Sequence, residues 1–178
     1  EIIQRIYINR IPKDYLPKGV EGNIYQRYKI NDVDMTKGNW LILTRTKSLW
    51  KPIPPFLKRK GLYFNTVEGN SIGKTLYEDI QTWEELIQGL MPPDIKRQRL
   101  EELTGEKNFN IHLSWDEAFK NVAFAKRQYM KAMLLNGEDL SKPPRIKVST
   151  IHGAKGGEAT NVVLFLNQTA NTIKGSKK

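Results

Sequence analysis

Short apolar segments separated by polar connectors make up the first half of the chain. Residues 24 to 30 alternate in strand fashion. The continuous apolar run over residues 40 to 44 predicts a strand that is buried on both faces, and residues 62 to 67 predict another strand. Between these two strands, a pair of prolines can occupy the first turn of a short helix over residues 54 to 60, with Gly61 as its C-terminal stop.

Helical periodicity dominates the middle of the chain. A second helix is indicated by apolar residues that recur at spacings of four and three, namely Leu76, Ile80, Trp83, Ile87 and Leu90. Another helix is predicted from Asp94 to Leu103. The clearest one starts at Ser114, which forms a capping box with Glu117 because each side chain can satisfy a free backbone N–H group. Its apolar face is predicted to carry Ala118, Val122, Ala125, Tyr129 and Met133, before a left-handed stop at Asn136-Gly137.

Strand patterns return near the C-terminus. Residues 145 to 151 and residues 161 to 166 are two apolar segments separated by a short polar, Gly-rich turn. Strands that alternate with helices, and that are apolar on both sides, are typical of a parallel α/β sheet. The predicted fold class is therefore α/β, with a parallel sheet flanked by helices and a helical insertion at residues 84 to 142.

The chain is strongly basic, and this narrows the class of partner. Its 178 residues include 29 Lys and Arg against 19 Asp and Glu, which gives a net charge of +10. This excess favours a polyanionic partner such as nucleic acid, because phosphate contacts release counterions and steer association. The alternative is a basic surface that contacts only solvent.

Other chemistries are excluded or disfavoured by composition. The chain has no cysteine, so it has no disulfide, no cysteine-ligated zinc and no cysteine nucleophile. No apolar run approaches the roughly 20 residues needed to cross a bilayer, and the N-terminal residues do not resemble a secretory signal. We therefore expect a cytoplasmic protein with no membrane partner. His152 has no second histidine or carboxylate cluster at ligand spacing, so no metal site is predicted in this chain.

Residues 69 to 75, Gly-Asn-Ser-Ile-Gly-Lys-Thr, look like a phosphate-binding P-loop. That motif requires four residues between its first glycine and the Gly-Lys-Thr, whereas this segment has three, and Glu68 stands where a glycine is required. One missing residue breaks the cradle of backbone N–H groups. We interpret the segment as a Gly-rich loop that leads into the helix at Leu76.

A second polar segment follows a buried strand. After residues 145 to 151 the chain contains His152, Lys155 and Glu158 in a Gly-containing turn, and an apolar strand comes next. Residues at the carboxyl end of a parallel strand lie where α/β folds bind ligands. Exposed backbone N–H groups and Lys155 suit a phosphate, and Glu158 suits a sugar hydroxyl.

This stretch resembles motif V of the UvrD/Rep-type superfamily 1 DNA helicases, in particular members from phages and their bacterial relatives. The family pattern Thr-x-His-x-x-Lys-Gly-x-Glu is filled by five residues at matching spacing: Thr150, His152, Lys155, Gly156 and Glu158. The resemblance implies that Gly156, Gly157 and Glu158 contact ATP. It implies that Thr150, His152 and Lys155 hold single-stranded DNA. Many relatives have an aromatic residue where this chain has Ala159, so the apolar anchor is smaller here.

The segment Leu41 to Thr46 resembles motif IV of the same family, a buried strand that delivers an arginine to ATP. By this resemblance Arg45 reaches the γ-phosphate, where its planar fork can stabilise the charge on the transferred group. It is the catalytic residue expected in this chain. Many relatives carry a tyrosine before this arginine to stack on adenine, and Thr44 stands there instead.

The resemblance also implies a domain arrangement. Residues 1 to 22 are expected to be a connector from a preceding motor domain. Residues 23 to 83 and 143 to 178 are expected to form the second RecA-like motor domain, and residues 84 to 142 a reduced helical insertion. The P-loop domain and motif VI are expected in other parts of a longer protein. The implied activity is ATP-dependent unwinding of DNA from 3′ to 5′, with ATP and Mg²⁺ bound mainly by the first motor domain. The expected partners are single-stranded DNA, a duplex junction and that first RecA-like domain.

Alternatives remain open at this point. One is a basic nucleic-acid-binding module without nucleotide-dependent activity, and another is a small enzyme that uses the Gly73-Lys74-Thr75 loop. Thr150 and His152 can also be a purely structural pair at a strand end. Among the aromatic residues, Trp83 and Trp115 are expected in the core, whereas Trp50, next to two lysines, is a candidate for stacking on DNA bases.

Overall fold

The computed structural model describes residues 22 to 167. The predicted connector at residues 1 to 22 lies almost wholly outside the described residues, and so does the basic tail after residue 167. The chain divides into two compact units, residues 1 to 34 and residues 35 to 178. The described part of the first unit contains one 3₁₀ helix, η1 (Ile30–Asp32), closed by a backbone bond from Val33 N–H to Ile30 C=O.

The strand predicted over residues 24 to 30 is wrong. These residues have no regular structure before η1, and Ile24 and Tyr28 are 99% and 91% exposed. An alternating pattern forms a strand only where a sheet edge accepts its backbone hydrogen bonds and where its apolar side is buried. Within the described residues, no strand pairs with this segment.

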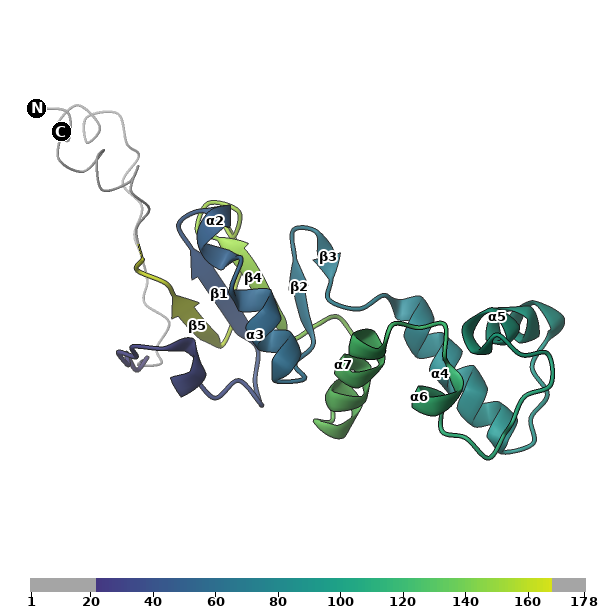
Figure 1. Ribbon diagram of the computed structural model, residues 1–178. Coiled ribbons are helices and arrows are strands. Elements are labelled where there is room, and N and C mark those ends of the chain that lie inside the picture. The colour runs from purple at the N-terminus through teal and green to yellow at the C-terminus, as the bar shows by residue number, and fades with distance from the viewer. Residues whose placement is uncertain (1–21, 168–178) are drawn as a thin grey trace, which may run out of the picture. The chain divides into compact units, whose positions relative to one another are not determined.

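The second unit contains a five-stranded sheet in the order β3-β2-β4-β1-β5 (Figure 1). Four of its strands run parallel, and β3 is antiparallel to β2. The strands are β1 (Trp40–Thr44), β2 (Phe64–Thr66), β3 (Gly69–Asn70), β4 (Ile146–Thr150) and β5 (Asn161–Leu164). The predicted α/β class is therefore confirmed, with a mixed, mostly parallel sheet. The short β2–β3 hairpin was not predicted.

One face of the sheet carries the core. Ile42 and Val148 are paired in register, and with Ile146 they are at most 1% exposed. The helices α2 (Lys47–Trp50) and α3 (Ile53–Arg59) lie in front of β1 and β4 in Figure 1. Helix α3 supplies Ile53, Phe56 and Leu57 to the core. Burial of these side chains is the main source of stability for this part of the fold.

The opposite face of the sheet is covered at β1, where Leu41 is 6% exposed, and is more open on the two strands beside it. Lys147 pairs with Leu41, which pairs with Val162, so these three positions share that face. Lys147 is exposed, and Val162 is 55% exposed. The prediction that residues 161 to 166 form a strand is correct, but β5 is shorter and is a half-exposed edge strand.

The helical insertion begins inside a helix. It is built by α4 (Lys74–Ile87), α5 (Asp94–Thr104), α6 (Trp115–Ala118) and α7 (Phe124–Leu135). Residue 84, where the insertion was expected to start, lies in α4. Trp83 is 1% exposed and meets Phe109 and Phe119 edge-on, with ring centroids 5.8 and 5.7 Å away. Trp83 and Trp115 are core residues, as predicted.

The long helix predicted after Ser114 is wrong, because it is broken into α6 and α7. Its start is correct: Glu117 Oε2 accepts hydrogen bonds from the Ser114 backbone N–H (3.2 Å) and hydroxyl (2.7 Å). The break spans residues 119 to 123. Within it, the Asn121 backbone N–H donates to Leu103 C=O and the Asn121 side-chain amide donates to Glu102 C=O. These bonds to the end of α5 replace the bonds that a continuous helix would make.

Hydrogen bonds join helix α7 to the residues just before β2 and just after β3. The Tyr129 hydroxyl donates to Leu62 C=O and also meets Ser71 Oγ, at 2.7 Å in each case. The Asn136 amide donates to the Lys60 and Gly61 carbonyls. Gly61 has φ +62°, and a Cβ there would lie 2.7 Å from Ala132 Cβ. Its predicted role as a helix stop is confirmed, and the close approach of α7 gives a second reason for glycine.

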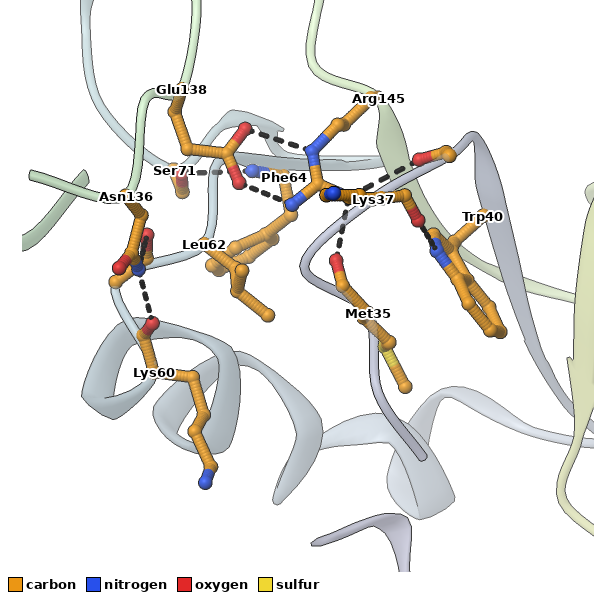
Figure 2. A network of polar contacts seen from close by, with 12 residues as sticks. Met35, Lys37, Trp40, Lys60, Leu62, Phe64, Ser71, Asn136, Glu138 and Arg145 are labelled. Atoms are coloured by element: carbon orange, nitrogen blue, oxygen red, sulfur yellow. Dashed lines mark hydrogen bonds and ion pairs between the residues drawn. The ribbon is translucent and has the colours of Figure 1, made fainter. Parts of the chain in front are cut away.

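A largely buried ion pair joins three segments of this unit (Figure 2). Arg145, just before β4, contacts Glu138, which follows α7, with N–O distances of 2.5 and 3.1 Å. The Glu138 side chain is 3% exposed and that of Arg145 is 21% exposed. Arg145 Nη1 also donates to Met35 C=O and Gly38 C=O, on the segment that leads into β1. The guanidinium therefore positions the start of β4, the approach to β1 and the end of the insertion.

Glu138→Ala should lower the free energy of unfolding by about 3 kcal/mol, because it leaves a partly buried guanidinium without its carboxylate. The measurement is urea unfolding followed by circular dichroism. Glu102→Ala is the matched control, since Glu102 also pairs with an arginine at 2.8 Å but its side chain is 67% exposed. The control should change the free energy by less than about 1 kcal/mol. Equal effects in the two variants would contradict this account.

Candidate functional site

The carboxyl ends of β1 and β4 lie side by side. We call this side of the sheet, where the parallel strands end, the carboxyl edge, and the side where they begin the amino edge. The register pairs Thr44 with Thr150, the last residue of each strand. One residue further on, Ile151 N–H donates to Thr44 C=O at 2.9 Å. Arg45 and His152 therefore leave the sheet at the same edge. The structure brings the two sequence motifs together at the place where parallel sheets bind ligands.

Arg45 sits in a tight turn between β1 and α2. On one side Thr44 is fully buried, and its hydroxyl donates to Thr46 C=O at 3.0 Å. On the other side Thr46 precedes the helix, and its hydroxyl meets Ser48 Oγ at 2.9 Å. Arg45 itself is exposed, and it forms no ion pair within the described residues. Its backbone is fixed while its guanidinium is available to an anion. Thr44 is buried, so it offers no surface for stacking on a base.

The loop after β4 is held by the strand that precedes it. The Thr150 hydroxyl accepts a hydrogen bond from Gly153 N–H at 3.0 Å, and Thr150 C=O accepts one from Ala154 N–H. A Cβ on Gly153 would lie 3.0 Å from Ser149 Oγ, so glycine permits a close approach to β4. Gly156 has φ +78°, a conformation that favours glycine. Thr150 thus has a structural role, whatever ligand it meets.

The rest of the motif lies in the same loop. His152 and Lys155 are exposed in the turn at the carboxyl edge. Gly157 N–H donates to Ala154 C=O at 2.8 Å, and Ala154 N–H donates to Thr150 C=O, so Gly157 stays close to the carboxyl end of β4. Glu158 follows directly, is exposed, and precedes β5 by three residues.

A pocket of about 340 Å³ opens beside the carboxyl end of β4. We call it the edge pocket. It is lined by Lys47, Trp50, Asn65, Thr66, Val67, Lys147, Val148, Ser149, Thr150 and Gly153. It forms because β2 ends at Thr66 while β4 continues to Thr150, which leaves one side of β4 without a neighbouring strand. Trp50 is 7% exposed, so it is a wall of this pocket rather than the free stacking platform that we considered.

The sequence pattern missed Asn65, Lys147 and Ser149 as site residues. One signal was present: Lys147 and Ser149 alternate with Ile146 and Val148 in a strand that was otherwise expected to be apolar. In a central parallel strand, such alternation indicates one open face. The charge of this region is positive, since Arg45, Lys47, Lys147 and Lys155 form no ion pair within the described part of the chain. The region suits an anionic ligand.

The P-loop-like segment does not form a phosphate cradle. Gly69 and Asn70 are the strand β3 of a hairpin, and Ser71 N–H donates to Phe64 C=O at 2.8 Å. Lys74 begins α4 and pairs with Glu78 at 3.3 Å. Residues 69 to 71 thus belong to the hairpin, in agreement with the interpretation from the spacing.

The described residues 22 to 167 contain no group of three or more His, Asp and Glu side chains placed to hold a metal ion. None of their helices is both long enough and apolar enough to span a membrane.

No protein-family model, curated protein or solved structure matches this chain.

Thr150→Val should loosen the loop after β4, because it removes the acceptor of the Gly153 N–H while keeping a β-branched side chain in the strand. Amide hydrogen exchange at Gly153 and Ala154 should accelerate by about tenfold, with Ile42 and Val148 unchanged. Thr150→Ser, which retains the hydroxyl, should behave like the parent chain. Unchanged exchange in the valine variant would show that the hydroxyl does not hold the loop.

Proposed function

We propose that this chain is the second RecA-like motor domain of an ATP-dependent DNA helicase of the UvrD/Rep type. The observation that carries the proposal is the meeting of Arg45 and the loop after β4 at one edge of a mostly parallel sheet. In α/β folds, ligands bind at that edge. The motif resemblances of both segments agree with this role.

Arg45 is the residue best suited to the nucleotide. An exposed guanidinium on a fixed backbone can reach a triphosphate that is held mainly by another domain, and it can stabilise charge on the transferred phosphoryl group. Bound ATP with Mg²⁺ would supply the phosphoryl group for hydrolysis. Of the other expected nucleotide contacts, Gly156 and Gly157 belong to the same loop as His152. Glu158 follows Gly157 directly at the end of this loop.

The unpaired cations around the edge pocket support contact with single-stranded DNA. Lys47, Lys147 and Lys155 can neutralise phosphates, and Thr150 and His152 lie beside them. Closure of two motor domains on ATP would then move the strand, as in other hinge-type cycles. A duplex junction and a first RecA-like domain are the partners that this proposal requires.

The same cations favour a second candidate, a basic nucleic-acid-binding module without nucleotide-dependent activity. The two candidates differ in what Arg45 does. In the motor it serves ATP hydrolysis, and in the module it is one cation among several.

The test uses the natural protein that contains this chain. Arg45→Ala should reduce ATP hydrolysis stimulated by single-stranded DNA by about a thousandfold, while DNA affinity falls no more than about threefold. Arg59→Ala, which removes an exposed arginine at the end of α3, is the control and should retain the parent rate. Hydrolysis that survives in the Arg45 variant would overturn the catalytic role. A natural protein that binds DNA but hydrolyses no ATP would favour the binding module.

A further inference from the structure

The edge pocket adjoins a second pocket on the same unit. This hairpin pocket has a volume of about 450 Å³ and is lined by Tyr63, Asn65, Asn70, Lys74, Leu140, Ser141, Lys142, Pro143, Pro144 and Lys147. Asn65 and Lys147 line both pockets and are paired in register on β2 and β4. The two pockets therefore meet at Asn65 and Lys147. Together, as what we call the path, they reach from the carboxyl edge to the residues that follow α7.

The charged residues that line the path are all lysines. No aspartate or glutamate lines either pocket, whereas four lysines do: Lys47, Lys74, Lys142 and Lys147. Lys147 stands at the junction, is exposed and forms no ion pair within residues 22 to 167. A row of cations without intervening carboxylates complements a chain of phosphates.

Two of these lysines have partners that phosphate can replace. Lys74 pairs with Glu78 at 3.3 Å, and Lys142 pairs with Asp139 at 2.8 Å. Both lysine side chains are more than 70% exposed. Ion pairs with this exposure contribute at most about 1 kcal/mol, so their lysines can turn to a phosphate at little cost.

The polar groups of the hairpin pocket are held in place. The Asn65 amide donates to Asn70 Oδ1 at 2.9 Å, and the Asn70 amide donates to the Tyr63 hydroxyl at 3.1 Å. Tyr63 and Trp50 are 3% and 7% exposed, so both rings form walls and leave no free face for stacking. The path therefore offers charge and hydrogen bonds to a backbone rather than a set of base-reading groups.

We propose that the edge pocket and the hairpin pocket form one groove for a single strand of nucleic acid, with Lys147 contacting a backbone phosphate at their junction. A single strand is flexible enough to follow two adjoining pockets, whereas a duplex bends only at a cost in energy. The inference rests on the proposed function for the kind of ligand, but it does not require ATP hydrolysis. It extends the contact surface beyond Thr150, His152 and Lys155 to the β2–β3 hairpin and the end of the insertion.

The experiment measures binding of the 178-residue chain to fluorescent oligothymidylates of about four and about twelve nucleotides, by anisotropy at several salt concentrations. Lys147→Gln should weaken both oligonucleotides by about tenfold, and it should reduce the slope of log affinity against log salt by about 0.7 for one lost phosphate contact. Lys147→Arg should restore binding. Lys142→Gln, at the far end of the groove, should weaken only the longer strand.

Lys96→Gln is the matched control, because it removes an exposed lysine of α5 that lines neither pocket. Its affinity should equal that of the parent chain. Equal effects of Lys147→Gln and Lys96→Gln would overturn the groove, and so would equal weakening of the short and long oligonucleotides by Lys142→Gln. The groove is also wrong if a duplex competes as well as a single strand, or if the chain binds no oligonucleotide at low salt. If Arg45→Ala abolishes ATP hydrolysis while Lys147→Gln leaves binding unchanged, the groove is refuted and the motor proposal is still supported.

Discussion

The ion pair between Arg145 and Glu138 is the constraint on which the arrangement of the second unit depends. Arg145 precedes the central strand β4, and its backbone C=O also accepts a hydrogen bond from Trp40 N–H, at the start of β1. One residue thus sets the start of both strands. The attraction in such a pair is largely offset by the loss of hydration. Its main effect is to select one register and one position for the end of the insertion.

The strand register that is fixed at the amino edge determines which residues of β1 and β4 lie together at the carboxyl edge. With Trp40 paired to Ile146, five residues of β1 and five of β4 end together at Thr44 and Thr150. A shift by one residue would turn Lys147 toward the core and Val148 toward solvent. The proximity of Arg45 to the loop after β4 therefore follows from hydrogen bonds at the other end of the strands.

Much of the fold was predictable because local patterns and tertiary contacts agree there. The strands β1 and β4, the stop at Gly61 and the cap at Ser114 all formed as expected. Two failures have a common cause. Residues 24 to 30 have the alternation of a strand but no sheet edge in the described part of the chain. The sequence after Ser114 has the period of a helix, but Asn121 forms hydrogen bonds to the end of α5 instead of helical ones. Neither the absence of a sheet edge nor the contact with α5 can be predicted from the local sequence.

The candidate site was predictable in part for a similar reason. Parallel neighbouring strands place their carboxyl ends together, so Arg45 and Thr150 could be assigned to one edge from their motifs alone. The edge pocket could not, since it depends on β2 being three residues long.

The fastening of α7 has a consequence for how this architecture can change over evolutionary time. The chain departs from the sheet after β3 and comes back through α7. Tyr129 of α7 joins the two stems through Ser71, which follows β3, and it also donates to Leu62 C=O, which precedes β2. A segment whose two stems are neighbours can be shortened, enlarged or exchanged without moving the strands on either side. The insertion is in this sense a replaceable module, and the bonds at its stems mark the boundary at which one such module can be grafted in place of another.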